Sequence, residues 1–250
     1  MKLLNLGCGG RCHEDWINLD FNSSSKFVQR HNLYEPLPFE DASIDVVYSS
    51  HVLEHFPKCF APKFLIECGR VLKKSGIIRI VVPDLEQIVR NYLTFLGIAR
   101  AGDKDGEEKY DWTMIELFDQ MVRNISGGGM LEYWKQDPMP QEDFVIERLG
   151  LEVKSALKLI RQNSRCHSKK DCFVQDSGSK GMFRLRGEIH QWMYDSFSLG
   201  RLLKEVGFDK VRQCAADESS IPNFCDYLLD IESDGSVRKP DSLFIEGIKS

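Results

Sequence analysis

The stretch LLNLGCGGRCHEDWINLD, residues 3–20, decides the fold class. An apolar run at 2–6 leads into the glycine-rich turn 7–10, and a second apolar run follows at 16–20. Short apolar runs bounded by glycine are typical of buried strands that enter tight turns. The segment between the runs is too short for a normal crossover helix of about ten residues or more. We therefore expect two strands joined by a turn.

Apolar runs and helical patterns alternate further along the chain. The run IIRIVV at 77–82 is typical of a strand that is covered on both faces. Pro83 ends it, and Asp84 is a suitable N-cap for a helix over 85–100. The other expected strands are 26–29, 44–50, 211–214 and 242–248, and the other expected helical stretches are 52–56, 63–73 and 198–206. This alternation predicts an α/β fold with a parallel sheet.

The composition changes after Arg100. A polar loop is expected at 101–109, helices at 112–124 and 141–161, and a polar, basic stretch at 162–180. Strand patterns are weak throughout this region. We therefore divide the chain into a core, 1–100 and 186–250, and a helical insertion or lid, 101–185.

Charge and cysteine usage exclude several classes of protein. The 33 basic and 38 acidic residues give a net charge of −5, so the chain lacks the basic footprint of a nucleic-acid binder. No apolar run approaches the roughly 18 residues of a membrane span. The 8 cysteines are too sparse for a disulfide scaffold, and without an export signal we expect reduced thiols in the cytoplasm. Cys166, His167 and Cys172 lack the second ligand pair of a zinc site.

The glycine turn and Asp20 form the first chemical constellation. Glycines let the backbone approach a ligand closely, and an acid that ends the next strand is placed to accept hydrogen bonds from ribose hydroxyls. The alternative is a tight turn with an unrelated, solvent-facing Asp20. A dinucleotide site fits less well, because Cys12 stands where the third glycine belongs and the acid follows Gly7 by 13 residues instead of about 20. An adenosine ligand without phosphates is the better match.

These residues resemble the class I S-adenosylmethionine-dependent methyltransferases. LLNLGCG at 3–9 matches the glycine motif of that family, and Asp20 matches its ribose-binding acid. Three further segments match: LPFEDASIDVVYSSHVLEHFP at 37–57, ECGRVLKKSGIIRIVVP at 67–83 and YDSFSLGRLLKEVGF at 194–208. Within the family the chain is most similar to compact bacterial enzymes that are often found with polysaccharide-biosynthesis genes. It departs at Asn5, where most relatives have an acid.

The resemblance implies a Rossmann-like sheet, mostly parallel with an antiparallel last strand, and S-adenosylmethionine as cofactor. It also implies which residues bind that cofactor. Backbone groups of the glycine motif would line its methionine and ribose side, and Asn32 and Leu33 would contact adenine, although Asn32 also suits a capping turn. The full implied set is Gly7, Cys8, Gly9, Asp20, Asn32, Leu33, Ser49 and Ser50.

The histidines supply candidates for a general base. His190 precedes the late helix, in a loop that faces the transfer site in this family, and its pKa range suits proton removal near neutrality. The alternative is a His190 that caps the helix or bonds Asp195. His51 is the second candidate. His51, Glu54 and His55 also follow the H-x-x-E-H order of inverted zinc proteases, but no further metal ligand is indicated.

The insertion is expected to hold the methyl acceptor. Glu116, Asp119, Gln120 and Arg123 fall at helical spacing, either as a polar pocket with an arginine clamp or as a solvated face. The local basic run Arg161, Arg165, Lys169 and Lys170 is expected to be a loop that attracts a phosphorylated or acidic acceptor.

The expected activity is methyl transfer to an oxygen, with nitrogen second, and a sugar hydroxyl of a glycan precursor is the favoured acceptor. The alternatives are a non-catalytic S-adenosylmethionine-binding regulatory module and a nicotinamide-dependent oxidoreductase. The expected partner is a small-molecule or glycan acceptor, and the sequence does not indicate an oligomeric state.

Overall fold

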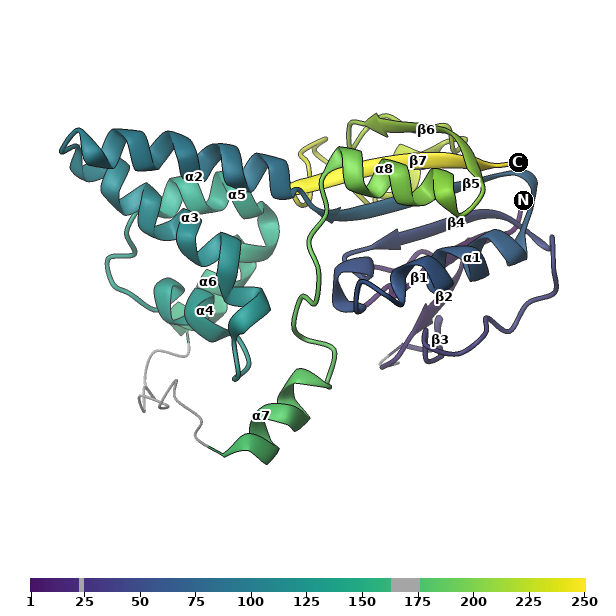
Figure 1. Ribbon diagram of the computed structural model, residues 1–250, viewed down its shortest axis with the longest axis horizontal. Coiled ribbons are helices and arrows are strands. Elements are labelled where there is room, and N and C mark those ends of the chain that lie inside the picture. The colour runs from purple at the N-terminus through teal and green to yellow at the C-terminus, as the bar shows by residue number, and fades with distance from the viewer. Residues whose placement is uncertain (23–24, 163–175) are drawn as a thin grey trace. The chain divides into compact units, whose positions relative to one another are not determined.

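The computed structural model describes residues 1–22, 25–162 and 176–250 (Figure 1). The chain divides into two compact units. The sheet unit comprises Met1–Asp84, Trp192–Val237 and Ser242–Ser250, and the helical unit comprises Leu85–Gln191 and Arg238–Asp241. The helical unit thus begins at Leu85 and not at residue 101, because the helix over 85–100 packs with the helices of the insertion.

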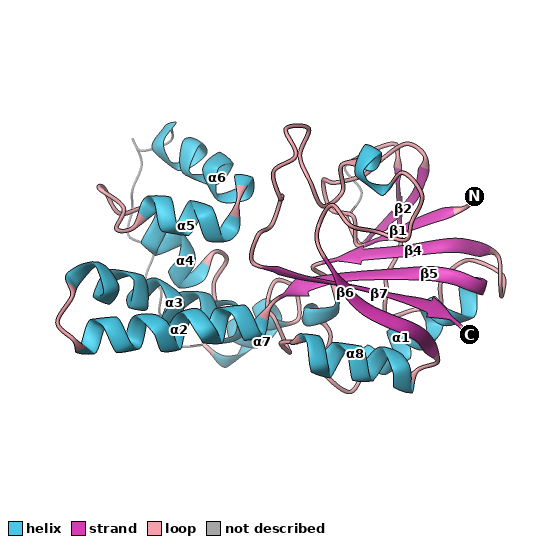
Figure 2. Cartoon of the chain, turned by 90° about the horizontal axis from the view of Figure 1, so that it is seen from above, coloured by secondary structure: helices cyan, strands magenta, loops and turns pink. Residues whose placement is uncertain are grey.

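The sheet unit holds seven strands in the order β3-β2-β1-β4-β5-β7-β6 (Figure 2). Strands β1 to β5 are parallel, and β7 is antiparallel to both of its neighbours. Their bounds are β1 Leu3–Leu6, β2 Trp16–Asp20, β3 Val28–Arg30, β4 Ile44–Ser50, β5 Leu72–Pro83, β6 Phe208–Cys214 and β7 Ser242–Lys249. The predicted mostly parallel sheet with an antiparallel last strand is confirmed.

The two faces of this sheet are covered differently. Helices α1, Ala61–Val71, and α8, Ser196–Glu205, pack on one face (Figure 2). The other face packs against the segment 214–231, in which the only regular helix is the short 3-10 helix η2, Phe224–Tyr227. As expected, no helix joins β1 to β2. The helix predicted at 63–73 ends at Val71, and β5 begins at the next residue.

The helical unit has its own apolar core around Trp112, Val145 and Leu157. Its helices are α2 Leu85–Arg100, α3 Lys104–Val122, α4 Gly128–Trp134, α5 Glu142–Leu149, α6 Leu151–Gln162 and α7 Ser177–Arg184. No helix within the described residues is both long enough and apolar enough to span a membrane.

Two predictions about this unit are wrong in detail. The loop expected at 101–109 is helical from Lys104, because the Asp103 side chain accepts a hydrogen bond from Gly106 N and starts α3 early. The single helix expected at 141–161 is two helices. Gly150 separates them with a φ of 71°, a backbone conformation that favours glycine.

Candidate functional site

The glycine turn after β1 has one packed side and one open side. Gly7 and Gly9 have φ values of 68° and 53°. A Cβ on Gly7 would lie 2.2 Å from Val52 Cγ2, whereas a Cβ on Gly9 would meet no atom within 4 Å. Gly7 N also donates to Leu19 O at 2.8 Å, which ties the turn to β2. The packed side fixes the turn, and the open side leaves room for a ligand against the backbone.

Asp20 is connected directly to this turn. Its Oδ2 accepts a hydrogen bond from Gly9 N at 2.8 Å, and its Oδ1 accepts one from Asn22 N at 2.9 Å. The residue is half-buried, and a carboxylate oxygen can accept a second hydrogen bond. The structure therefore argues against a solvent-facing acid unrelated to the turn. Asp20 retains acceptor capacity beside the open glycines.

The strand order places this pair at a recognised type of ligand position. Strand β1 lies between β2 and β4, so the chain leaves β1 on one side and returns on the other. Ligands of open α/β sheets bind at the carboxyl ends of strands where the order reverses in this way. The glycine turn, Asp20 and the end of β4 share this edge.

Asn5 has a structural role at the same edge. It is buried, and its Nδ2 donates to Arg11 O and to Asn18 Oδ1, both at 3.1 Å. A carboxylate has no donor for these two acceptors. The departure from the family's usual acid is thus explained by a bond that holds the turn.

The Cys8 thiol is not suited to nucleophilic or metal-binding chemistry. Its side chain is buried, and burial, reinforced by the charge of Asp20, raises the pKa of the Cys8 thiol to about 12. A neutral thiol is a poor nucleophile and a poor metal ligand. This agrees with a cofactor role for its main chain.

The remaining predicted cofactor residues are held mainly by local structure. Asn32 Oδ1 accepts from Tyr34 N at 3.1 Å, which favours the capping turn over recognition of adenine, while Leu33 packs beside the sheet core. Ser49 Oγ donates to Leu6 O at 3.2 Å and supports the pairing of β4 with β1. Ser50 is half-buried at the end of β4.

Glu67 and Arg70 on α1 hold the matched loop 37–41, and sequence reasoning missed them. Glu67 Oε1 accepts from Leu37 N at 2.6 Å. Arg70 donates to Leu37 O at 3.0 Å and to Phe39 O at 2.8 Å. The i, i+3 spacing of an acid and an arginine within the matching segment 67–83 was the available clue.

His51 follows β4 with a φ of 54°, which is uncommon for a residue other than glycine. Its Nδ1 lies 3.2 Å from Glu54 Oε1, and its Nε2 lies 2.9 Å from Ser242 Oγ. The intervening 3-10 helix η1, Leu53–His55, does not include His51. His51 and His55 therefore do not share the α-helical face that an i, i+4 metal pair requires.

Two buried groups near His51 were not predicted to matter. Glu54 is fully buried. Tyr194 forms a backbone bridge with Asp84 at the end of β5, and its hydroxyl has no hydrogen-bond partner among the described residues. Burial, with the charge of Glu54 second, raises the pKa of Tyr194. The sequence indicates Glu54 through the H-x-x-E-H order and through the matching segment 37–57, which contains it.

His190 lies in the helical unit. Its backbone N–H donates to Gln120 O at 2.9 Å, and the residue is buried. It does not cap α8, because Asp195 does so: Asp195 Oδ1 accepts from Ser198 N at 2.7 Å, and Asp195 N donates to Ser198 Oγ at 3.1 Å. The capping alternative for His190 is therefore wrong.

The polar residues of α3 form internal ion pairs. Glu116 is buried against Arg148, and burial raises its pKa. Arg123 lies 3.0 Å from Asp119 Oδ2 and 3.1 Å from Glu188 Oε1, with only 7% of its side chain exposed. The i, i+4 pair of the second alternative is present between Asp119 and Arg123, but Glu116 and the Arg123 side chain are buried and not solvated. Arg165, Lys169, Lys170 and the Cys166–Cys172 segment lie outside the described residues.

Comparison with known proteins finds a match within the first part of the sheet unit. Residues 4–80 match the family model of the methyltransferase domain. The sheet unit has the mostly parallel sheet with an antiparallel last strand that the resemblance implies. The resemblance inferred from residues 3–83 is confirmed, and S-adenosylmethionine is the cofactor that this methyltransferase family implies.

Two curated relatives are probable S-adenosylmethionine-dependent methyltransferases of two Mycobacterium tuberculosis strains. Each is 42% identical over 57 residues, which cover 23% of this chain and 20% of the relative. The chain therefore spans about a fifth of the length of the curated relatives it matches.

Solved methyltransferase structures are similar at low identity. A methyltransferase from Archaeoglobus fulgidus is 15% identical, with a TM-score of 0.43 over 99% of this chain and 86% of that one. The CurJ carbon methyltransferase is 11% identical, with a TM-score of 0.43 over 100% of this chain and 48% of that one. Nothing about the acceptor follows from either.

The sheet edge that holds the glycine turn, Asp20 and the end of β4 fits the implied cofactor. The space above Gly9 and Gly10 is free of protein atoms within 4 Å of an added Cβ, and the Asp20 carboxylate stands beside it. A ribose needs an acceptor for its hydroxyls, and a methionine chain needs approach to the backbone. Both requirements are met by residues of one edge.

Proposed function

We propose that this chain is an enzyme that transfers a methyl group from S-adenosylmethionine to an oxygen, with nitrogen as the second choice. The observation that carries the proposal is the bond between the Asp20 carboxylate and Gly9 N, beside the open face of the glycine turn. This acid ends β2 at the point where the strand order reverses. The proposed location is the cytoplasm, in keeping with the free thiols of the described cysteines.

Each residue of the edge has a proposed part in binding. Asp20 accepts the ribose hydroxyls, the backbone of Gly7, Cys8 and Gly9 borders the methionine side, and Leu33 offers an apolar surface to adenine. The cofactor supplies a methyl group already activated on a sulfonium. The protein's remaining tasks are to align the acceptor and to remove its proton.

We propose His190 as the general base, with His51 second. The contacts of His51 support its candidacy, because a carboxylate next to Nδ1 favours the tautomer in which Nε2 is the acceptor. A positioned base typically contributes about 10²–10⁴-fold to the rate. His190→Gln and His51→Gln, each measured at saturating acceptor, should show which histidine lowers kcat while the affinity for S-adenosylhomocysteine stays unchanged.

Calorimetry with S-adenosylhomocysteine and with NAD tests the cofactor. We expect saturable binding of S-adenosylhomocysteine and none of NAD, and the reverse would replace the methyltransferase with a nicotinamide-dependent oxidoreductase. Turnover then separates an enzyme from a non-catalytic binding module. Nucleotide sugars and glycan fragments are the first acceptors to screen, because a sugar hydroxyl of a glycan precursor is the acceptor that we favour.

A further inference from the structure

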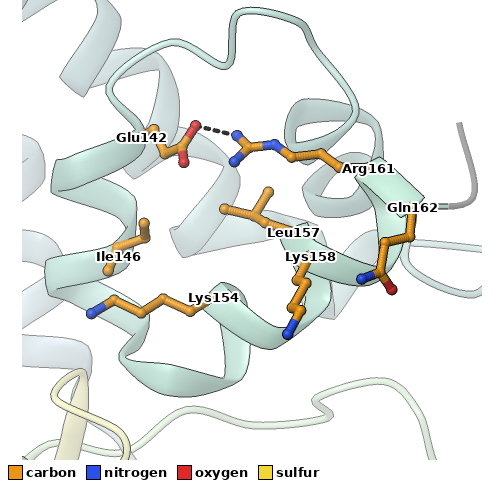
Figure 3. A pocket seen from close by; sticks show the side chains of 7 residues that line it. All are labelled: Glu142, Ile146, Lys154, Leu157, Lys158, Arg161 and Gln162. Carbon is orange, nitrogen blue, oxygen red and sulfur yellow. Dashed lines mark hydrogen bonds and ion pairs between the residues drawn. The ribbon is translucent and has the colours of Figure 1, made fainter.

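The helical unit contains an open pocket of about 480 Å³ between α5 and α6 (Figure 3). A volume of this order suits a small molecule. Its lining residues are Glu142, Ile146, Lys154, Leu157, Lys158, Arg161 and Gln162. All belong to the described part of the helical unit, and none belongs to the sheet edge that holds the glycine turn and Asp20.

The pocket is positively charged in a chain that is negative overall. Lys154, Lys158 and Arg161 stand at i, i+4 and i+7 of α6 and therefore share one helix face. Arg161 pairs with Glu142 across the pocket (Figure 3). Lys154 and Lys158 have no ion-pair partner among the residues that the structure describes. The lining residues are three cations and one carboxylate, and the Asp137 carboxylate also acts on Arg161, so that within the described residues Lys154 and Lys158 are the lining cations left without an opposite charge.

Helix energetics do not account for these lysines. Like charges at i, i+4 destabilise a helix by a few tenths of a kcal/mol. The helix dipole favours cations only in the last turn, whereas Lys154 is the fourth residue of α6. A bound anion with two negative charges would offset both costs.

The other lining residues indicate which groups the ligand carries besides its anion. Leu157 is buried and, with half-buried Ile146, forms an apolar floor below the charged groups. The Glu142 carboxylate and the Gln162 amide can bond hydroxyl groups at the rim. A bare anion would use neither feature.

We propose that this pocket binds a phosphorylated sugar. Lys154 and Lys158 hold the phosphate dianion, the apolar floor contacts the carbon face of the sugar, and Glu142 and Gln162 bond its hydroxyls. The inference goes beyond the proposed methyl transfer and does not depend on it. As a statement about binding, it can be tested without turnover.

Calorimetric titration of the full chain with glucose 1-phosphate tests the site. We expect saturable binding that weakens about tenfold or more in the double variant Lys154→Gln, Lys158→Gln, which corresponds to about 1.4 kcal/mol or more. The matched control is Lys74→Gln, Lys204→Gln, which removes two exposed lysines of the sheet unit and should bind as the wild type does. Equal binding by the wild type and the pocket variant would overturn the proposal.

Two further probes define the ligand class. Glucose without phosphate should bind far more weakly than glucose 1-phosphate, and so should inorganic phosphate. Inorganic phosphate that bound as tightly as the ester would overturn the assignment of a sugar phosphate. Single substitutions, Lys154→Gln and Lys158→Gln, keep the test decisive if the double variant does not fold.

A parallel titration with S-adenosylhomocysteine separates this proposal from the proposed function. Its affinity should be the same in the wild type and in the pocket variant. Failure of the wild type to bind S-adenosylhomocysteine would refute the methyltransferase assignment alone. If the pocket variant lost its affinity for glucose 1-phosphate and kept its affinity for S-adenosylhomocysteine, the pocket would be supported as the sugar-phosphate site.

Discussion

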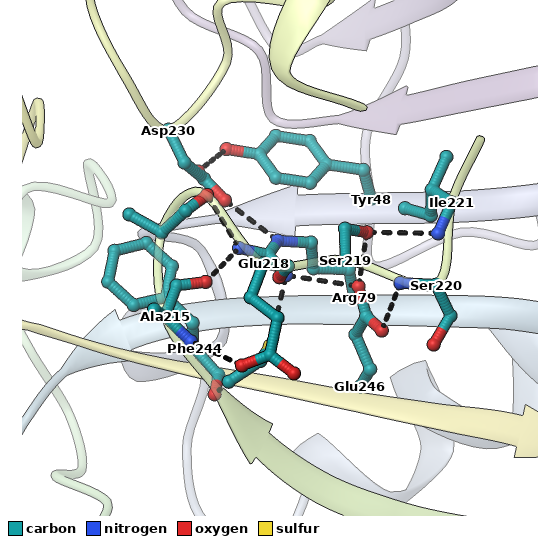
Figure 4. Close-up of polar contacts among 12 residues, drawn as sticks. Tyr48, Arg79, Ala215, Glu218, Ser219, Ser220, Ile221, Asp230, Phe244 and Glu246 are labelled. Atoms are coloured by element: carbon teal, nitrogen blue, oxygen red, sulfur yellow. Dashed lines mark hydrogen bonds and ion pairs between the residues drawn. The ribbon is translucent and has the colours of Figure 1, made fainter. Parts of the chain in front are cut away.

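Asp20 and Arg79 are charged residues of the same sheet in contrasting surroundings. Asp20 ends β2, is half-buried and accepts two backbone hydrogen bonds. Arg79 lies within β5 with none of its side chain exposed, and its Nε donates to Asp230 Oδ2 at 2.8 Å while its Nη1 donates to Glu246 Oε1 at 3.0 Å (Figure 4). The carboxylate has spare bonding capacity, and the guanidinium has none. This difference separates a binding group from a structural one.

Arg79 anchors the face of the sheet that α1 and α8 do not cover. Its Nη2 donates to Ala215 O at 3.1 Å and to Ala216 O at 3.2 Å, and its guanidinium lies 4.5 Å from the Phe224 ring centroid. Asp230 also accepts from Tyr48 Oη at 2.5 Å (Figure 4). Charged and aromatic contacts thus hold the segment 214–231 where no α-helix covers the sheet.

The two regions also differ in how far the sequence predicts them. The glycine turn and Asp20 were found because the strand, the turn and the acid follow one another within residues 3–20. Arg79 was hidden inside an apolar strand pattern, and its carboxylate partners are 151 and 167 residues away in the chain. Similarly, helical spacing predicts that Glu116 and Arg123 share a helix, and the structure places Glu116 on α3 and Arg123 at its C-cap, but their partners Arg148 and Glu188 come from other segments. Local sequence patterns predict turns and the residues at strand ends. Ion pairs between segments that are far apart in the chain can be found only once the fold is known.

Replacement of Arg79 should have the largest effect on stability. Arg79→Met leaves Asp230 buried without its cation, whereas Glu246 keeps Arg212 at 3.1 Å. Loss of one partner of a buried ion pair costs about 3–5 kcal/mol. Urea denaturation followed by circular dichroism gives the change in unfolding free energy. Arg201→Met is the matched control, because Arg201 pairs with Glu205 on the exposed face of α8 and should cost about 1 kcal/mol or less. Equal losses in the two variants would contradict a structural role for Arg79. Asp230→Asn offers a milder change if Arg79→Met does not fold.

Replacement of Asp20 should affect binding more than folding. Asp20→Ala removes the acceptor of the ribose hydroxyls, and charge-assisted hydrogen bonds are worth about 1.5–3 kcal/mol each. We expect the affinity for S-adenosylhomocysteine to fall about tenfold or more, as measured by calorimetry. Asp15→Ala, at the other end of β2, should leave that affinity unchanged. A folded Asp20→Ala protein with wild-type affinity would remove the ribose assignment and leave Asp20 as a support of the glycine turn.

Glu67 is intermediate between Asp20 and Arg79, because it is partly buried and paired with Arg70. The Arg70 guanidinium, more than any other group, holds the pKa of Glu67 below its ordinary value, and the bond from Leu37 N adds to this. A lowered pKa in the folded protein means that the charged form favours folding. The contribution is present above the ordinary pKa of about 4.3, and it is lost as the pH falls through the lowered value.

Glu67→Gln should therefore destabilise the protein by about 1 kcal/mol or less at pH 7, since partly exposed pairs contribute little. The difference from the wild type should shrink as the pH falls from the ordinary pKa of about 4.3 toward and through the lowered value, because the wild-type carboxyl becomes protonated over that range. Urea denaturation at pH 7, 5 and 3.5 measures it, with Glu205→Gln on α8 as the matched variant of an exposed glutamate. A Glu67→Gln effect that stays constant over this range would contradict a role for the charge of Glu67 in holding the loop 37–41. In that event the contacts of α1 with the loop would not depend on the charge of Glu67. Glu67 would then not be an intermediate between Asp20, a charge available for binding, and Arg79, a charge that stabilises the fold.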